Sequence, residues 1–345
     1  MPVIHDSSTW PDYGIIDPQL EKFLEAHPEL RESGFGDCLD VPAAQERLLQ
    51  EVAHAPPPDT SGVDKSEIRI PVRDGSHIRA ILYKPQTKPV AGSPFAVLFH
   101  GGGWCIGLPE MEEPTALLLA KHHGAVVISV GYRKAPEYRF PTAIHDSWDA
   151  LKWCSEHAST LDAISSKGFL IGGGSAGGNI AAVLSHLARD ENISPPLTAV
   201  YLQIPFTCAA EAIPERYKVE FTSYEQNANA PGLDLKAVNF FREHYQGDAS
   251  SELFSPMLWP SGHKDLPKTY LQICGLDPLR DDGLLYEREL RNAKVPTRVD
   301  VYPGVPHGFE GKYHHLDLAS KAVRDKEIAF DWLLERDSEA MLACS

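Results

Sequence analysis

The fold of this chain is decided by one stretch, Ile171-Gly172-Gly173-Gly174-Ser175-Ala176-Gly177-Gly178-Asn179. The apolar residues 169–171 lead into it, and residues 180–188 beyond it favour a helix. A serine flanked by glycines therefore lies where a strand turns sharply into a helix, which is the pattern of a nucleophile elbow. The glycines are needed because a Cβ atom would collide in so tight a turn. The stretch predicts that Ser175 is a nucleophile.

Two other interpretations fit the same letters. Gly172-x-Gly174-x-x-Gly177 has the form of a dinucleotide-binding fingerprint, which is a weak signal when it stands alone. The next predicted strand, residues 197–204, has no acidic residue at its end to hold a ribose. A phosphate-binding loop is excluded because no Gly-Lys-Ser/Thr follows the glycines. A structural glycine turn with an idle serine remains as the simplest alternative.

Composition limits the classes of partner. The chain has 345 residues and is 43% hydrophobic, which is enough to bury a large core in one or two domains. Its 32 basic and 48 acidic residues give a net charge of −16, which argues against nucleic acid or an anionic membrane surface as a partner. No apolar run could span a bilayer, and residues 1–10 lack the apolar core of a secretory signal. We expect a soluble, cytoplasmic monomer or homodimer with no stable membrane association.

The cysteines indicate a reducing environment. They are scattered along the chain, without a Cys-x-x-Cys pair. In a chain of this length, such a pattern predicts reduced and mostly buried thiols instead of a disulfide framework. No spacing of histidines and carboxylates suggests a metal site. The six cysteines are Cys38, Cys105, Cys154, Cys208, Cys274 and Cys344.

The first 60 residues predict a helical segment of their own. Residues 17–27 begin with an Asp-Pro pair, the pattern of a cap followed by proline in the first helical turn, and residues 41–54 are amphipathic. Pro56-Pro57-Pro58 ends the second helix and marks a boundary. We therefore divide the chain into an N-terminal helical segment, 1–60, and a larger domain, 61–345.

The larger domain alternates strands with helices. Residues 66–73 and 78–84 alternate in polarity as expected for a hairpin around Asp74-Gly75. From residue 95 onward, short apolar runs alternate with helical stretches, which indicates a mostly parallel sheet with helices on both faces. Residues 205–260 interrupt this alternation. The predicted strands are 95–99, 125–130, 169–171, 197–204, 268–274 and 298–302, and the predicted helices are 112–122, 142–157, 176–189, 235–245, 281–293 and 316–335.

A second glycine-rich loop follows directly on the predicted strand 95–99 and reads His100-Gly101-Gly102-Gly103-Trp104. Three glycines leave backbone N–H groups unobstructed, which suits an oxyanion hole built from main-chain donors. Ala176, next after the serine, would give a further N–H at the start of a helix whose dipole favours negative charge. The alternative is a glycine loop with no chemical task.

A nucleophilic serine needs a base that is held by a third group. His307 lies on a glycine-flanked loop after the last predicted strand, at the edge of the sheet where open α/β folds gather their sites. Asp277 is the first acid beyond the preceding predicted strand, whereas Asp281 and Asp282 are expected to form the cap and first turn of the next helix. The order Ser175, Asp277, His307 predicts a triad with His307 as base and Asp277 as its orienting group.

The chain has 15 histidines, so the choice of His307 as the base excludes others. His314 and His315 lie beyond the glycine turn and are expected on the surface. His122 and His123 end a predicted helix, and we expect them to interact with its C-terminus.

These motifs together resemble the hormone-sensitive-lipase family of α/β-hydrolases, which includes bacterial, archaeal and fungal carboxylesterases; the fungal members are the most similar. The similarity runs from about residue 65 to the C-terminus. It rests on His100-Gly101-Gly102-Gly103-Trp104, on Tyr132-Arg133-Lys134-Ala135-Pro136-Glu137 with Phe140-Pro141, on the serine elbow, on Asp277-Pro278-Leu279-Arg280-Asp281 and on His307-Gly308-Phe309.

The resemblance implies an α/β-hydrolase fold with a helical cap. By that resemblance the oxyanion donors are Gly102, Gly103 and Ala176, and the N-terminal helices and residues 205–260 form a cap over the acyl pocket. Two positions depart from the family pattern: many members carry Asp or Thr where this chain has Gly174, and Lys134 replaces a usual leucine. Neither change removes a catalytic group.

The sequence thus predicts a serine carboxylic-ester hydrolase that forms an acyl-enzyme on small to medium acyl esters and needs no cofactor or metal. Acyl chains of about two to eight carbons would suit a closed pocket of limited depth. One alternative is a biosynthetic hydrolase or acyltransferase acting on a thioester, a lactone or an amide, because triad chemistry does not separate these. A ligand-binding protein similar to plant gibberellin receptors is disfavoured because those receptors lack the histidine present here as His307.

Overall fold

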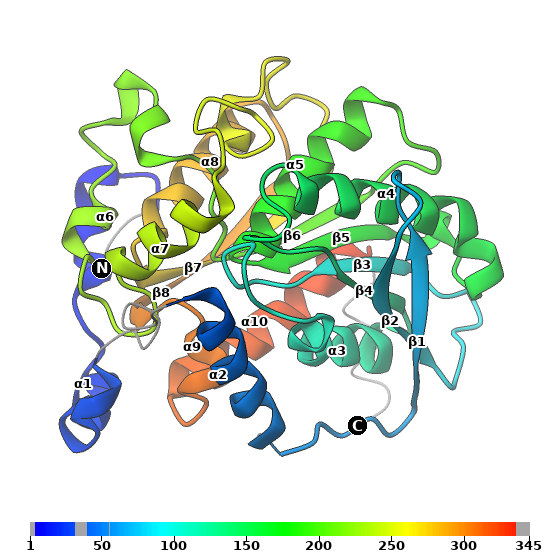
Figure 1. Ribbon diagram of the computed structural model, residues 1–345, viewed down its shortest axis with the longest axis horizontal. Helices are drawn as coiled ribbons and strands as arrows, with labels where there is room; N and C mark the ends of the chain where they lie inside the picture. The colour runs from blue at the N-terminus through cyan, green and yellow to red at the C-terminus, as the bar shows by residue number, and fades with distance from the viewer. Residues whose placement is uncertain (1–3, 32–39, 55, 336–345) are drawn as a thin grey trace.

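A computed structural model describes residues 4–31, 40–54 and 56–335 (Figure 1). Within these residues the strands form one eight-stranded sheet in the order β1-β2-β4-β3-β5-β6-β7-β8. The six strands from β3 to β8 are mutually parallel, and β1 and β2 extend one edge in antiparallel fashion. The strands are β1 (Val63–Pro71), β2 (His77–Pro85), β3 (Phe95–Phe99), β4 (Val126–Gly131), β5 (Phe169–Gly174), β6 (Ala199–Gln203), β7 (Lys268–Leu276) and β8 (Thr297–Pro306).

Helices cover both faces of the sheet (Figure 1). The helices α4, α5 and α8 pack on one face, and α3 and α10 pack on the other. Along β3 the side chains alternate between two apolar cores, with Val97 and Phe99 in one and Ala96 and Leu98 in the other. This burial on both sides explains why residues 95–99 form a continuous apolar run.

The helix pattern of the sequence is confirmed with small shifts at the ends. Residues 41–54, 142–157 and 235–245 form helices with the predicted bounds. The α-helices are α1 (Pro18–Ala26), α2 (Val41–His54), α3 (Glu113–His123), α4 (Thr142–His157), α5 (Ala176–Asp190), α6 (Ser223–Gln226), α7 (Leu235–Tyr245), α8 (Arg280–Asn292), α9 (Phe309–Lys312) and α10 (Asp317–Leu333).

The hairpin at the start of the larger domain is also confirmed. The strands β1 and β2 pair from Val63 with Pro85 to Pro71 with His77, so the turn holds Asp74 and Gly75. Gly75 has a φ of +83°, a backbone conformation that favours glycine. The three strands β5, β7 and β8 run beyond their predicted ends, and β8 starts one residue early, at Thr297.

The N-terminal elements lie against the carboxyl ends of β7 and β8. The 3₁₀ helix η1 (Ser7–Gly14) packs there, and the Asp17 N–H donates to the Gly304 carbonyl at 3.0 Å. A Cβ on Gly275 would lie 2.1 Å from the Tyr13 carbonyl oxygen, and a Cβ on Gly304 would lie 2.3 Å from the Asp17 nitrogen. The chain's beginning is therefore packed tightly onto the two strands that precede Asp277 and His307.

Two further expectations concern the cysteines and the membrane. Cys105, Cys154, Cys208 and Cys274 are free and buried, as predicted, whereas Cys38 and Cys344 lie outside the described residues. Among the helices that the structure describes, none is long and apolar enough to cross a membrane.

Candidate active site

Ser175 stands at the turn between β5 and α5, as the glycine pattern predicts. Its φ of 55° and ψ of −117° are rare for a residue with a side chain, and its N–H donates to the Gln203 carbonyl at 2.8 Å. A Cβ on Gly173 or Gly177 would lie 2.2 or 1.8 Å from the Phe99 carbonyl oxygen. The glycines are therefore required by the close approach of β3, and the prediction of a tight turn is confirmed.

His307 and Asp277 meet Ser175 at the carboxyl end of the parallel strands. The Ser175 hydroxyl donates to Nε2 of His307 at 2.9 Å, and Nδ1 of His307 donates to Oδ2 of Asp277 at 2.7 Å. Asp277 is 1% exposed, and its Oδ1 accepts the Leu279 N–H at 2.9 Å. The structure therefore brings the three predicted residues into one line of hydrogen bonds.

The direction of these hydrogen bonds determines which nitrogen of His307 can accept a proton. Because the buried Asp277 carboxylate accepts a hydrogen bond from the N–H at Nδ1 of His307, the lone pair of the neutral imidazole is on Nε2. That lone pair faces the Ser175 hydroxyl. An imidazole held in this tautomer can accept the serine proton while the hydroxyl oxygen forms a new bond.

The glycine loop after β3 passes directly beside the serine. A Cβ on Gly101 would lie 3.0 Å from the Gly174 carbonyl oxygen and 3.4 Å from the Ser175 Cβ. Gly102 and Gly103 have φ values of +107° and +58°, so the loop uses backbone conformations that favour glycine. Ala176, the first residue of α5, follows the serine. The glycine loop therefore approaches Ser175 through Gly101, and the role of Gly102, Gly103 and Ala176 as oxyanion donors stays a prediction.

The loop is held by contacts of motif residues that the sequence alone did not predict. The Tyr132 hydroxyl donates to the His100 carbonyl at 2.8 Å. Burial lowers the pKa of His100 to about 3, so its ring is neutral, and its Nδ1 donates to the Gly101 carbonyl at 2.7 Å. Lys134 Nζ donates to the Gly107 carbonyl at 2.7 Å, and burial lowers its pKa. Lys134 therefore supports the segment that directly follows the glycine loop.

Two helices outside the central layers contact the same loop. Gln45 on α2 accepts the Gly107 N–H through its Oε1 at 2.8 Å. The ring of Phe241 on α7 packs against Gly103, because a Cβ on Gly103 would lie 2.4 Å from that ring. Trp104 stacks on Tyr245 of α7 with ring centroids 4.7 Å apart. The N-terminal segment and the 205–260 segment therefore both border the predicted oxyanion loop.

Asp281 and Asp282 lie in the first turn of α8, but neither is its cap, contrary to the prediction for this pair. Both are fully buried. Asp281 accepts the N–H groups of Thr222 and the following residue at 2.8 Å and pairs with the buried Arg280 at 2.7 Å. Asp282 accepts the Thr207 N–H at 3.0 Å. These carboxyl groups tie the 205–260 segment to the core.

The remaining histidines take no part in the line of hydrogen bonds. His314 and His315 are exposed, as predicted. His122 and His123 lie in the last turn of α3, as predicted, and they also face acids on α10. Nδ1 of His122 lies 3.0 Å from Glu327, so these rings help to join α3 to α10.

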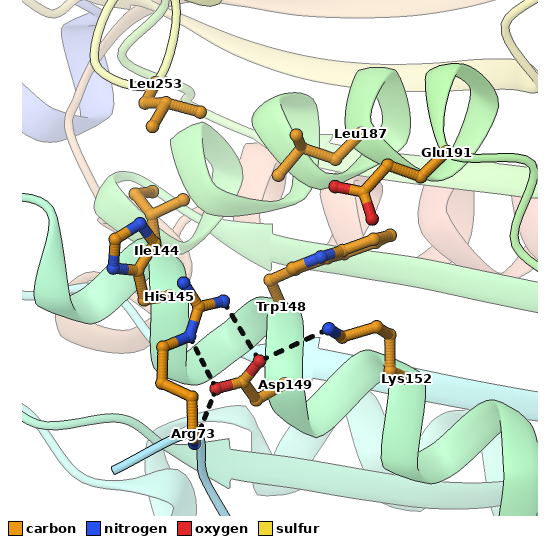
Figure 2. A pocket seen from close by; sticks show the side chains of 9 residues that line it. All are labelled: Arg73, Ile144, His145, Trp148, Asp149, Lys152, Leu187, Glu191 and Leu253. Carbon is orange, nitrogen blue, oxygen red and sulfur yellow. Dashed lines mark hydrogen bonds and ion pairs between the residues drawn. The ribbon is translucent and has the colours of Figure 1, made fainter.

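A groove of about 450 Å³ opens between α4 and α5 (Figure 2), and its lining does not include Ser175, Asp277 or His307. Its cationic side chains Arg73 and Lys152 both pair with Asp149, at 2.9 and 3.5 Å. The lining residues are Arg73, Ile144, His145, Trp148, Asp149, Lys152, Leu187, Glu191 and Leu253. In the part of the chain that the structure describes, no group of three or more His, Cys, Asp or Glu side chains could hold a metal ion.

The fold and the site place the chain in a known family. The profile of the family described as the alpha/beta hydrolase fold matches residues 96–311, which include Ser175, Asp277 and His307. The chain belongs to this α/β-hydrolase family and is of its carboxylesterase type.

The relatives share most of their length with this chain. The AB hydrolase superfamily protein B1A11.02 of Schizosaccharomyces pombe is 37% identical over 319 residues, which cover 92% of this chain and 94% of that protein. Carboxylesterase NlhH of Mycobacterium tuberculosis is 35% identical over 302 residues, covering 85% and 88%. Among solved structures, vibralactone cyclase superposes with a TM-score of 0.79 at 32% identity, covering 94% of this chain and 96% of that one.

Proposed function

We propose that the protein is a serine carboxylesterase that uses Ser175, His307 and Asp277 as its triad. The observation that carries the proposal is the unbroken line of hydrogen bonds among these side chains, at 2.9 and 2.7 Å. The similarity to carboxylesterase NlhH supports an ester as the substrate class. The proposed substrate is a small molecule, and the net charge of −16 argues against nucleic acid.

In the proposed first half-reaction, His307 Nε2 takes the Ser175 proton as the hydroxyl oxygen bonds to the carbonyl carbon of the ester. Backbone N–H groups of Gly102, Gly103 and Ala176 would receive the negative charge that develops on the carbonyl oxygen. Asp277 holds the imidazole and stabilises the imidazolium that forms. The imidazolium then gives its proton to the departing alcohol, which leaves an acyl group on Ser175.

In the second half-reaction, water takes the place of the alcohol. His307 Nε2 removes a proton from the water as its oxygen attacks the acyl carbon, and the same oxyanion donors serve again. When the tetrahedral intermediate collapses, the proton on His307 returns to Ser175 and the free acid leaves. No cofactor enters either half-reaction.

We also propose that residues 61–345 form the catalytic domain, and that residues 1–60 together with residues 205–260 of that domain act as a cap over the acyl pocket. The contacts of Gln45 with Gly107 and of Phe241 with Gly103 support this division, because each brings a cap segment to the oxyanion loop. A covered site favours acyl chains of about two to eight carbons. The free, buried cysteines support a reducing compartment, and we propose the cytoplasm.

One comparison favours a second candidate function. The similarity to vibralactone cyclase, at 32% identity, supports acyl transfer within the substrate itself. In such a reaction a hydroxyl group of the acyl chain would attack the acyl-enzyme in place of water, and a lactone would leave. The two functions share the first half-reaction and differ in the second.

The proposal is tested with p-nitrophenyl esters of increasing acyl length, with an aryl amide and a thioester assayed alongside. We expect turnover of the esters, with kcat/KM highest for acyl chains of about two to eight carbons. A hydroxyacyl ester added to the panel separates the candidates, because a lactone product would indicate transfer and a free acid hydrolysis. A kcat/KM that keeps rising to long-chain esters would contradict the covered pocket.

A further inference from the structure

A buried polar cluster lies on the α3 and α10 face of the sheet, beside the residue that precedes the nucleophile. It consists of Glu112, Gln203, Glu310 and Lys326. Lys326 Nζ donates to Oε2 of Glu310 at 2.7 Å, and Gln203 Nε2 donates to Oε1 of the same carboxylate at 3.0 Å. Glu310 and Lys326 have side chains only 14% and 7% exposed, and Glu112 is 7% exposed.

The cluster connects the two loops that must meet for catalysis. Gln203 accepts the Ser175 N–H at 2.8 Å through its backbone carbonyl, and its side chain binds Glu310. Glu310 belongs to α9, which begins two residues after His307. A single residue, Gln203, therefore links the backbone of Ser175 to the segment that carries His307.

Glu112 lies on the same side of the serine turn as the Gln203 side chain. Oε1 of Glu112 lies 4.0 Å from the point where a Cβ on Gly174 would stand, and Oε1 of Gln203 lies 3.5 Å from the same point. The nearby backbone of Gly174 also lowers the pKa of the Glu112 carboxyl group, because it favours the ionised form. The carboxyl group therefore lies beside the residue directly before Ser175.

We propose that Glu112 is a positioning residue: through Gly174 and the cluster of Gln203, Glu310 and Lys326, its carboxylate holds the Ser175 turn in register with His307. The inference rests on the proposed role of Ser175 as the nucleophile. Glu112 touches no reacting atom, so it acts through the geometry of the triad.

The charge of Glu112 changes in the range where such an enzyme is assayed. Burial raises its pKa to about 7, and the positive charge of Lys326 and the backbone of Gly174 oppose the rise, while Glu310 adds to it. Burial, with a smaller contribution from the charge of Glu112, raises the pKa of the phenols of Tyr201, Tyr83 and Tyr132, so they stay neutral. The ionised form of Glu112 interacts more strongly with the backbone of Gly174.

The test compares kcat of the parent and of Glu112→Gln on p-nitrophenyl acetate between pH 5.5 and 8.5. Glutamine imitates the protonated acid, so we expect similar values at pH 5.5 and a variant about fivefold slower at pH 8.5, with the change centred near pH 7. The matched control is Glu113→Gln. Glu113 is the next residue, is similarly buried, and pairs with Lys65 at 2.6 Å instead of facing the cluster. Its kcat ratio to the parent should not vary with pH.

A ratio of parent to Glu112→Gln that stays constant with pH would overturn the inference, as would the same pH-dependent loss in Glu113→Gln. If Glu112→Gln does not fold, Gly174→Asp answers the question by placing a second carboxylate against Glu112. We expect it to be about tenfold slower than Gly174→Ala at pH 8.5. The Ala variant adds a Cβ with only ordinary contacts, at 3.5 and 4.0 Å. Equal rates for the two would overturn the inference.

These outcomes are separate from the test of the nucleophile. If the parent fails to form a covalent adduct at Ser175 with an organophosphate, the proposed function is wrong. If the adduct forms and the pH profiles of parent and Glu112→Gln coincide, the proposed function stands and the role of Glu112 is wrong.

Discussion

Three aspartates within six residues of sequence have three different tasks in this chain. Asp277 faces His307, Asp281 pairs with Arg280, and Asp282 accepts backbone N–H groups of the 205–260 segment. All three are nearly or fully buried, so burial alone does not distinguish them. Their partners distinguish the three aspartates, so substitution of each one should have a different effect on activity and stability.

Replacing Asp277 should affect the reaction more than the fold. In Asp277→Asn an amide faces Nδ1 of His307, and its N–H₂ group would favour the wrong imidazole tautomer. We expect kcat to fall by roughly 10⁴, by analogy with the serine-protease triad. Steady-state kinetics on a p-nitrophenyl ester checks this; a loss within tenfold would remove Asp277 from the triad.

Asp281→Asn should instead damage stability. It would leave the fully buried Arg280 without its carboxylate partner, which costs on the order of 3–5 kcal/mol. Asp282→Asn should cost less. Burial raises the pKa of Asp282 well above its usual range, so the neutral acid is favoured and asparagine keeps a neutral oxygen acceptor. Urea unfolding of the two variants measures the difference, and equal losses would contradict it.

The buried Glu112 should make stability depend on pH. Its pKa rises from 4.5 to about 7 on folding, so its contribution is complete below pH 4.5 and is lost as the pH rises through 7. Glu112→Gln removes this dependence. Relative to the parent, the variant should gain roughly 3 kcal/mol between pH 4.5 and pH 8.5. Denaturant unfolding of the parent and the variant at both pH values measures this gain. An equal difference in the free energy of unfolding at the two pH values would show that Glu112 does not titrate in this range.

At the scale of elements, the glycine loop after β3 depends on helices distant in sequence. The Gly107 N–H is satisfied by Gln45 of α2, across 62 residues of chain. Gln45→Leu would leave this partly buried donor unpaired, at a cost of about 1–3 kcal/mol. We expect lower thermal stability and a higher KM in this variant, since α2 contacts the segment that follows the predicted oxyanion donors Gly102 and Gly103.

Gln50→Leu provides the matched control, because Gln50 lies on the same helix, is exposed, and donates from its side-chain amide to Glu46 of that helix at 3.1 Å. It should change neither stability nor KM. If Gln45→Leu and Gln50→Leu have the same thermal stability and the same KM, the contact of Gln45 with Gly107 does not affect function.

At the scale of the whole molecule, the N-terminal segment belongs to the same packed unit as the triad. Trp10 and Tyr13 of η1 are 1% and 4% exposed, and the backbone of Tyr13 passes against Gly275, two residues before Asp277. Removal of residues 1–14 should therefore lower both the thermal midpoint and kcat. A truncated chain with unchanged kcat would show that this packing does not position Asp277.

The sequence was sufficient for most of this architecture because the strands β3 to β7 are buried on both faces and stand out as apolar runs. The elbow, the glycine loop, Asp277 and His307 were found because each directly follows a predicted strand. The tasks of Asp281, Asp282 and Lys134 were not, because their partners at Thr222, Thr207 and Gly107 lie far away in sequence. Local patterns carry no information on such contacts.

The central claim is that Ser175 is the nucleophile, and peptide mapping after reaction with an organophosphate tests it most directly. We expect a covalent adduct on Ser175, and no adduct in Ser175→Ala, which should keep the fold while kcat falls by roughly 10⁶. An adduct on another serine, or a Ser175→Ala variant that retains the activity of the parent, would contradict the account.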